Sequence, residues 1–123
     1  MVLFWLVLAS APVVLEGSIP GPVREHPVRV LVWTPGNFLK TPSQSLVIPA
    51  GAALTFRFEV DLGQWCVSAF EDENANGKLD MGFFGPREPS GFWRPYSAWR
   101  KPRFDDVGRT VDAPMKGIEI ILD

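Results

Sequence analysis

The stretch ALTFRFEV, residues 53–60, alternates strictly between apolar and polar side chains. The alternation sorts them into an apolar set and a polar set: Leu54, Phe56, Phe58 and Val60 against Thr55, Arg57 and Glu59. Successive side chains of a β-strand point to opposite faces, so one face of this segment is apolar and the other polar. The pattern therefore predicts a strand with one face buried in a core.

The same alternation recurs along the chain in three more clear segments and three weaker ones. The clear segments are PVRVLVW (27–33), QWCVSAF (64–70) and GIEIIL (117–122), and the weaker ones are VVLEGSI (13–19), SQSLVIP (43–49) and residues 81–84. Helical periodicity is limited to a single turn at RFDDVG, residues 103–108. About seven short strands separated by Pro- and Gly-bearing turns predict an all-β fold, a single antiparallel β-sandwich with a long irregular segment before the last strand.

Length and composition indicate one compact domain. The chain has 123 residues, of which 46% are hydrophobic, so it can bury one core but not two. A formal net charge of −2 and the lack of a basic helix or arm argue against a nucleic-acid partner. One cysteine, Cys66, cannot form an internal disulfide. We expect the domain to span residues 12–123.

The N-terminal residues resemble an export signal. An apolar run from Val2 to Ala9 leads into Ala9-Ser10-Ala11, a small-x-small pattern that signal peptidases accept. The run is shorter than the roughly 20 residues needed to cross a bilayer, so no transmembrane span is expected. We expect residues 1–11 to be a signal peptide of an exported, periplasmic or extracellular protein; the alternative is a buried first strand.

The acidic segment EDENANGKLD, residues 71–80, is a candidate calcium-binding loop. Oxygen-bearing groups recur at alternate positions in the order of the first part of an EF-hand loop: Asp72, Asn74, Asn76, the Lys78 carbonyl and Asp80, with Gly77 at the turn. The position of the bidentate glutamate holds Phe83 instead, and a strand rather than a helix precedes the loop. Missing ligands could come from water or from Glu88, Asp105 and Asp106. Because only two of the ligands within the loop proper are carboxylates, weak calcium affinity is predicted, with a dissociation constant of about 10⁻⁴ to 10⁻³ M.

The alternative for this segment needs no ion. In an Asx-rich hairpin loop, Asn and Asp side chains accept hydrogen bonds from nearby backbone N–H groups, and Asn76-Gly77 supplies a left-handed turn. Both interpretations use the same residues. What favours calcium is the local concentration of negative charge, with three acidic residues at 71–73 and Asp80 against Lys78 alone.

Aromatic and basic side chains alternate through residues 85–109. If exposed, Trp93, Tyr96 and Trp99 could form a stacking platform for a carbohydrate or another envelope-surface ligand, with arginines over the rings adding cation–π contacts. The alternative is that the aromatic rings seal an open end of the sandwich while the arginines stay solvated or pair with the acidic loop. Exposure of the rings distinguishes the two.

Few residues offer enzymatic chemistry. His26 is the only histidine and has no nucleophile nearby in sequence, and Cys66 lies within a predicted strand, where a buried, unreactive thiol is expected. A small hydrolase would require Glu88, Asp105 and Asp106 to converge in an open cleft. We therefore expect a non-enzymatic module with a binding or structural role.

Three blocks, AFEDENANGKLD, GFFGPREPSGFW and KPRFDDV, resemble the bacterial family catalogued as domain of unknown function 2141, whose members are typically exported. The matching residues are Asp72, Asn74, Asn76, Gly77 and Asp80; Gly85, Glu88, Gly91 and Phe92; and Pro102, Phe104 and Asp106. Glu71 stands where the family usually has His. The resemblance implies a transthyretin-like or immunoglobulin-like β-sandwich without a known catalytic activity.

Overall fold

The computed structural model describes residues 12–78, 81–82, 85–86, 88–96 and 100–123. The predicted signal peptide, or alternative first strand, falls on residues 1–11 and lies outside the described residues.

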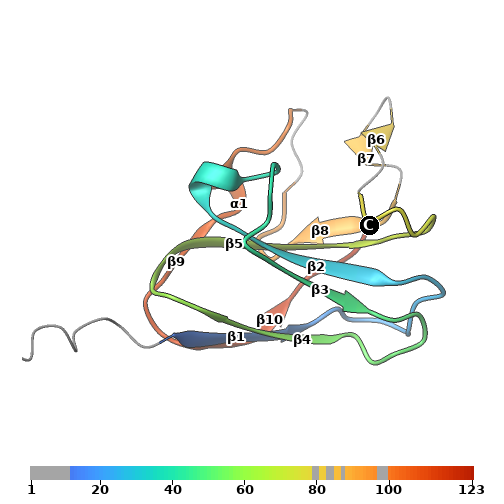
Figure 1. Ribbon diagram of the computed structural model, residues 1–123, viewed down its shortest axis with the longest axis horizontal. Coiled ribbons are helices and arrows are strands. Elements are labelled where there is room, and N and C mark those ends of the chain that lie inside the picture. Colours follow the sequence, from blue (N-terminus) through green and yellow to red (C-terminus); the bar gives the residue numbers. More distant parts are fainter. Residues whose placement is uncertain (1–11, 79–80, 83–84, 87, 97–99) are drawn as a thin grey trace, which may run out of the picture.

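Two β-sheets face each other across one core (Figure 1). The first has the strand order β10-β1-β4, made of Met115–Glu119, Val13–Ser18 and Thr55–Val60. The second has the order β3-β2-β5-β8, made of Gln44–Ile48, Val28–Trp33, Gly63–Glu71 and Ser90–Phe92, and β9 (Arg109–Val111) also pairs with β5. A short hairpin, β6 (Met81–Gly82) and β7 (Gly85–Pro86), projects beyond β8 (Figure 1). The predicted all-β sandwich is confirmed.

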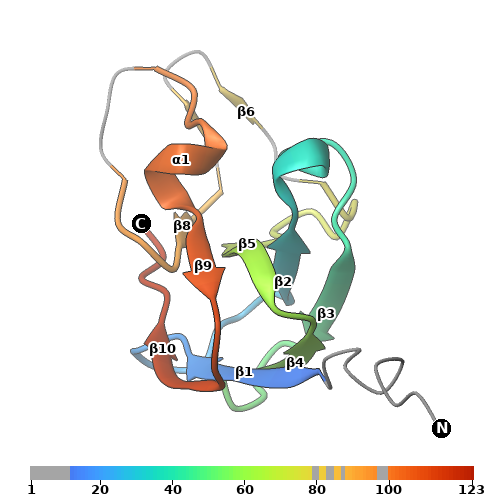
Figure 2. The ribbon, with the colours of Figure 1, turned by 90° about the vertical axis from the view of Figure 1, so that its left-hand side faces the viewer.

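The segment that predicted the fold forms β4, and its alternation is borne out. Phe56, Phe58 and Val60 are buried, whereas the three polar residues that alternate with them, Thr55, Arg57 and Glu59, are exposed. From the opposite sheet, the valines of β2 at positions 28, 30 and 32 are fully buried. Figure 2 shows the two layers after a turn of 90°. The buried side chains of both sheets belong to one core cluster.

The first sheet is not purely antiparallel, because β1 pairs with β4 antiparallel but with β10 parallel. The predicted last strand also differs in extent, since β10 covers Met115–Glu119 and the chain then leaves the first sheet. Its end crosses to the second sheet, where Ser90 and Asp123 exchange two backbone hydrogen bonds of 3.2 and 3.1 Å. The C-terminal segment therefore ties the two sheets together at one edge.

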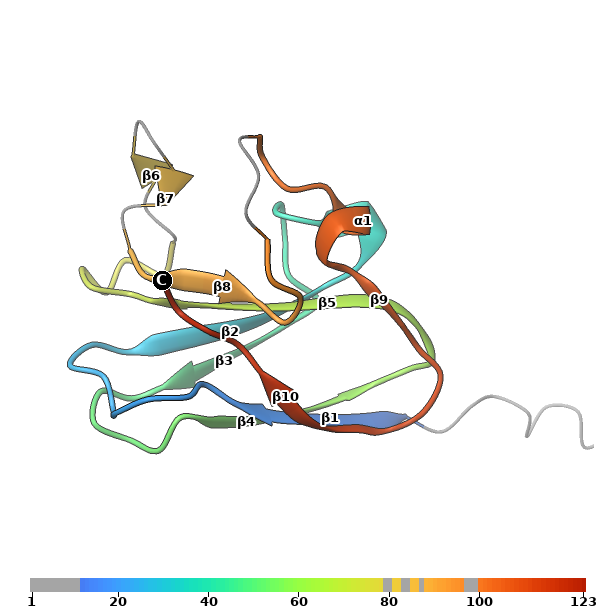
Figure 3. The same cartoon turned by 180° about the vertical axis from the view of Figure 1, so that it is seen from behind.

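Strand β5 is buried on both faces, which simple alternation did not predict. Cys66, Ser68 and Phe70 are buried as well as Val67 and Ala69 between them. The outer face of the second sheet is covered by the 3-10 helix Pro35–Asn37 and by α1 (Phe104–Val107), seen from behind in Figure 3. An aromatic cluster lies under this cover, with Phe38 ring centroids 6.2, 6.1 and 5.8 Å from those of Trp33, Phe92 and Phe104. The predicted helical turn at residues 103–108 is confirmed as α1.

Candidate cation-binding loop

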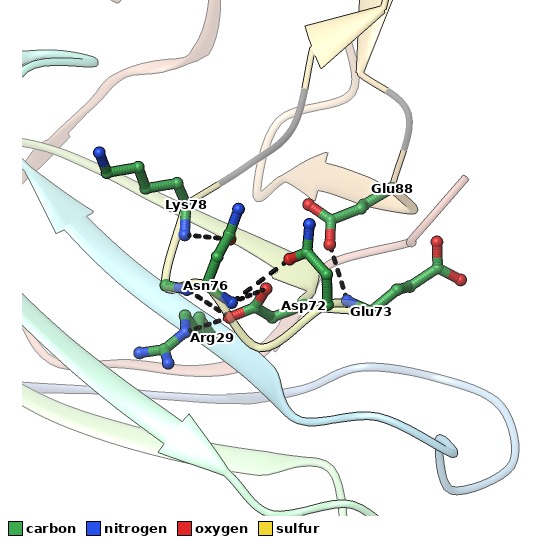
Figure 4. Close-up of polar contacts among 8 residues, drawn as sticks. Arg29, Asp72, Glu73, Asn76, Lys78 and Glu88 are labelled. Carbon is green, nitrogen blue, oxygen red and sulfur yellow. Dashed lines mark hydrogen bonds and ion pairs between the residues drawn. The ribbon is translucent and has the colours of Figure 1, made fainter.

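Asp72 organises the loop that follows β5. Its side chain is fully buried, and Oδ2 accepts hydrogen bonds from the Gly77 N–H and from Arg29 Nε, both at 2.8 Å, while Oδ1 accepts from the Asn76 N–H at 3.2 Å (Figure 4). Burial alone would raise the pKa of Asp72, but the Arg29 hydrogen bond and charge together with the two loop N–H groups lower it overall. Asp72 is therefore held as a carboxylate at the base of the loop.

The two asparagines continue the pattern. Asn74 Oδ1 accepts a hydrogen bond of 3.3 Å from the Asn76 N–H, and Asn76 Oδ1 accepts one of 2.9 Å from the Lys78 N–H. The left-handed residues are Ala75 (φ 55°) and Gly77 (φ 77°), so the expectation is confirmed for Gly77 but wrong for Asn76. A left-handed alanine costs about 1–2 kcal/mol, which the surrounding hydrogen bonds must offset.

Glu88 reaches the loop from the chain that precedes β8. It is only 4% exposed, and its Oε2 accepts a hydrogen bond of 2.7 Å from the Glu73 N–H (Figure 4). Of the residues predicted as additional ligands, Glu88 is thus the one that the structure brings to the loop. Together with Asp72 it places two buried carboxylates against a single turn.

Glu71, the last residue of β5, belongs to a second polar cluster. Its Oε1 accepts a hydrogen bond of 3.2 Å from Arg24 Nη1, and its Oε2 lies 2.9 Å from His26 Nδ1. The hydrogen bond to Glu71 and the nearby negative charge raise the pKa of His26. In the register of β5 against β2, Glu71 lies opposite Val28. The next residue, Asp72, contacts Arg29. Sequence reasoning considered His26 only as a catalytic base, because the contact with Glu71 spans 45 residues.

The remaining predicted ligands differ in where they lie. Asp80 lies outside the described residues. Lys78, whose backbone carbonyl is the predicted ligand, stays in the loop through its N–H bond to Asn76 Oδ1, and its side chain extends away from Asp72 (Figure 4). Asp105 and Asp106 lie in α1, which leads into β9, and β9 pairs with the opposite end of β5 from Glu71. Asp106 is held there by Arg100 at 2.7 and 3.0 Å and by the Arg103 N–H. The Arg100 hydrogen bonds and the Arg103 N–H lower the pKa of Asp106 to about 2. Glu88 and the two aspartates thus do not converge.

The predicted stacking platform is wrong for Trp93. This ring is only 4% exposed, its Nε1 donates a hydrogen bond of 2.6 Å to the Val107 carbonyl, and the Arg109 guanidinium lies 5.5 Å from the ring centroid. Tyr96 is half-buried against the core, and Trp99 lies outside the described residues. The Trp93 ring is part of the hydrophobic core, and Tyr96 packs against that core, so neither ring forms an exposed platform.

Two smaller expectations concern the basic segment and the cysteine. Arg94 donates to the Gly108 carbonyl at 2.8 Å, so this arginine serves its own segment instead of the acidic loop. Cys66 is free and fully buried, as expected for an unreactive thiol, and burial raises its pKa.

Fold and loop together define the class: a small β-sandwich domain with an Asx-rich turn braced by buried carboxylates. Residues 30–118 match the family model described as "Uncharacterized protein conserved in bacteria (DUF2141)", and the chain belongs to this family. No curated protein and no solved structure matches the chain. In the part of the chain that the structure describes, none of the helices has the length and apolar character needed to span a membrane.

Proposed function

We propose that this protein is a non-enzymatic, exported binding or structural module whose loop 72–78 binds Ca²⁺. The ion would hold the loop closed and thereby stabilise the adjoining chain that carries Glu88. The weak predicted affinity suits a compartment in which calcium is plentiful, as expected outside the cytoplasm.

The observation that carries the proposal is the convergence of oxygen atoms. Asp72 Oδ1 and Asn74 Oδ1 both accept from the N–H of Asn76, so they already point toward one locus (Figure 4). Hard cations such as Ca²⁺ are bound by carboxylate, amide and backbone oxygens together with water. An ion at this locus would take both oxygens as ligands in place of the Asn76 N–H.

Charge supports the same proposal. Asp72 is a buried carboxylate, and burying negative charge is costly without a positive partner. Asp72 pairs with Arg29 and Glu71 pairs with Arg24 and His26, while the exposed Glu73 adds further negative charge next to Asp72. A divalent cation at the loop would reduce this repulsion, whereas a hairpin turn alone requires no such charge.

The left-handed backbone at Ala75 is a third support. Strained conformations persist where the surroundings determine them, and they occur often at ligand-binding turns. An ordinary turn could place glycine or asparagine there at lower cost.

A thermal melt tests the proposal. With a dissociation constant of about 10⁻⁴ to 10⁻³ M, about 10 mM CaCl₂ should stabilise the protein by roughly 1.4–2.7 kcal/mol relative to EDTA, which corresponds to about 5–15 °C in Tm. Asn74→Ala and Glu88→Gln should reduce this calcium-dependent shift. Asn37→Ala, at an exposed asparagine in the 3-10 helix Pro35–Asn37, is the matched control and should keep it. An equal shift with MgCl₂, or no shift in the parent protein, would leave the Asx-turn interpretation.

A further inference from the structure

His26, Glu71 and Glu73 bring three ligand atoms of metal-binding type together at the edge of the sandwich. One imidazole nitrogen and two carboxylate oxygens all lie within 4.8 Å of one another. His26 lies in the connection between β1 and β2. Glu71 is the last residue of β5, and Glu73 is the second residue after it, in the turn that follows the strand. This turn keeps the Glu73 carboxylate close to Glu71 and His26.

The donor set differs from that of the calcium loop in chemistry. Imidazole nitrogen with carboxylate oxygen suits borderline divalent ions such as Zn²⁺, whereas Ca²⁺ takes oxygen ligands only. Bonds of about 2.0–2.2 Å place neighbouring ligand atoms of a Zn²⁺ ion roughly 3–3.5 Å apart. The distance of 2.9 Å between His26 Nδ1 and Glu71 Oε2 is already close to that spacing. An ion would displace the proton that these two atoms share.

The surrounding groups hold the ligands in place. Arg24 Nη1 binds Glu71 Oε1, which leaves Oε2 directed at His26. The backbone N–H of Glu73 is fixed by Glu88 Oε2, while the Glu73 side chain is exposed and free to swing toward an ion. Hydrogen bonds to the far side of ligating groups commonly set ligand orientation at metal sites. The 40% exposure of the His26 side chain gives an ion access from solvent.

We infer that His26, Glu71 and Glu73 form a site for one Zn²⁺-like divalent ion, with water completing its coordination. Its ligand atoms differ from those of the proposed calcium site, although Glu73 lies within the loop 72–78: Asp72 contacts Arg29 and the loop N–H groups, whereas Glu71 contacts Arg24 and His26. It does not depend on calcium binding. Three protein ligands with open positions would leave the ion able to accept a further ligand.

Calorimetric titration with ZnCl₂ in a buffer that contains millimolar CaCl₂ tests the inference. We expect one ion per chain to bind, and we expect His26→Ala and Glu73→Gln each to weaken binding by at least about tenfold. Glu25→Gln changes an exposed neighbouring glutamate outside the cluster and is the matched control, with unchanged affinity. The visible spectrum of bound Co²⁺ provides a second measurement: parent protein and Glu25→Gln should give the same bands, and His26→Ala should lose them.

Circular dichroism of each variant checks that a loss of binding is not a loss of fold. Absence of saturable Zn²⁺ binding in the parent protein would overturn the inference. Equal Zn²⁺ affinity in a folded His26→Ala variant would overturn it as well.

Discussion

Replacing Asp72 by alanine should destabilise the domain more than any other single change in the loop, even without metal. The substitution removes the acceptors of three hydrogen bonds, from Gly77, Asn76 and Arg29. Bonds to a charged group contribute about 1.5–3 kcal/mol each. The sum is discounted because Arg29 is 28% exposed and can be rehydrated, and because the Asn76 N–H keeps Asn74 Oδ1 as acceptor. We therefore expect a loss of about 3 kcal/mol.

Urea unfolding in EDTA, followed by tryptophan fluorescence, measures this loss without any contribution from an ion. At about 4–8 °C per kcal/mol, Tm should fall by at least about 12 °C. Asn74→Ala is the matched comparison, because Asn74 is exposed and the hydrogen bond of 3.3 Å that its Oδ1 accepts comes from a donor it shares with Asp72; it should cost less than about 1 kcal/mol. Equal destabilisation by the two variants would refute the conclusion that Asp72 organises the loop.

Three more predictions concern the rest of the molecule. The pKa of His26 is raised in the folded protein, so its ion pair with Glu71 stabilises the fold fully below about pH 6.5, and this contribution is lost as the pH rises through the folded-state pKa. The Tm of the parent protein should therefore fall between about pH 6 and 8.5 relative to that of His26→Gln. Parallel pH profiles of the two proteins would contradict this prediction. Trp93→Phe removes the hydrogen bond to the Val107 carbonyl and should cost about 1–2 kcal/mol in urea unfolding, whereas a neutral result would contradict the buried indole contact. Gly91→Ala should cost about 2 kcal/mol or more, since the new Cβ would lie 2.0 Å from the Ile121 carbonyl oxygen, and unchanged stability would show that the C-terminal segment is not packed there.

The fold could be predicted because its strongest signal is local. The residues around Phe56 and Phe58 alternate because one face of this strand is exposed to solvent and the other is buried, and the structure confirms this arrangement. Alternation does not predict burial where both faces of a strand are covered. In β5, Cys66 and Ser68 are buried because α1 and the 3-10 helix pack on the outer face of the second sheet. The sequence of β5 alone does not indicate that these two helices cover its outer face.

The candidate site was predictable in its residues but not in its partners. The spacing of Asp72 and Asn74 indicated a turn rich in oxygen atoms, and both lie in one. Arg29, however, is 43 residues away from Asp72, and only the register between β2 and β5 brings them together. The same register places the segment that carries His26 beside Glu71. Such pairings depend on tertiary structure, which side-chain alternation does not encode.

The paired first and last strands show the same limit. Alternation predicted strands at residues 13–19 and 117–122, but it carries no information on whether neighbours run parallel or antiparallel. Their parallel pairing follows from the chain path, which returns to β1 after β9 and then crosses to β8.

A calcium titration followed by ¹H–¹⁵N NMR tests the central proposal most directly, because the loop N–H groups of Asn76, Gly77 and Lys78 report on the oxygens that would bind the ion. We predict saturable shifts of these three signals with a midpoint of about 0.1–1 mM, and little change at the Asn37 N–H of the separate 3-10 helix. Loop signals that stay in place up to about 10 mM calcium, or that drift no more than the rest of the spectrum, would contradict the proposal.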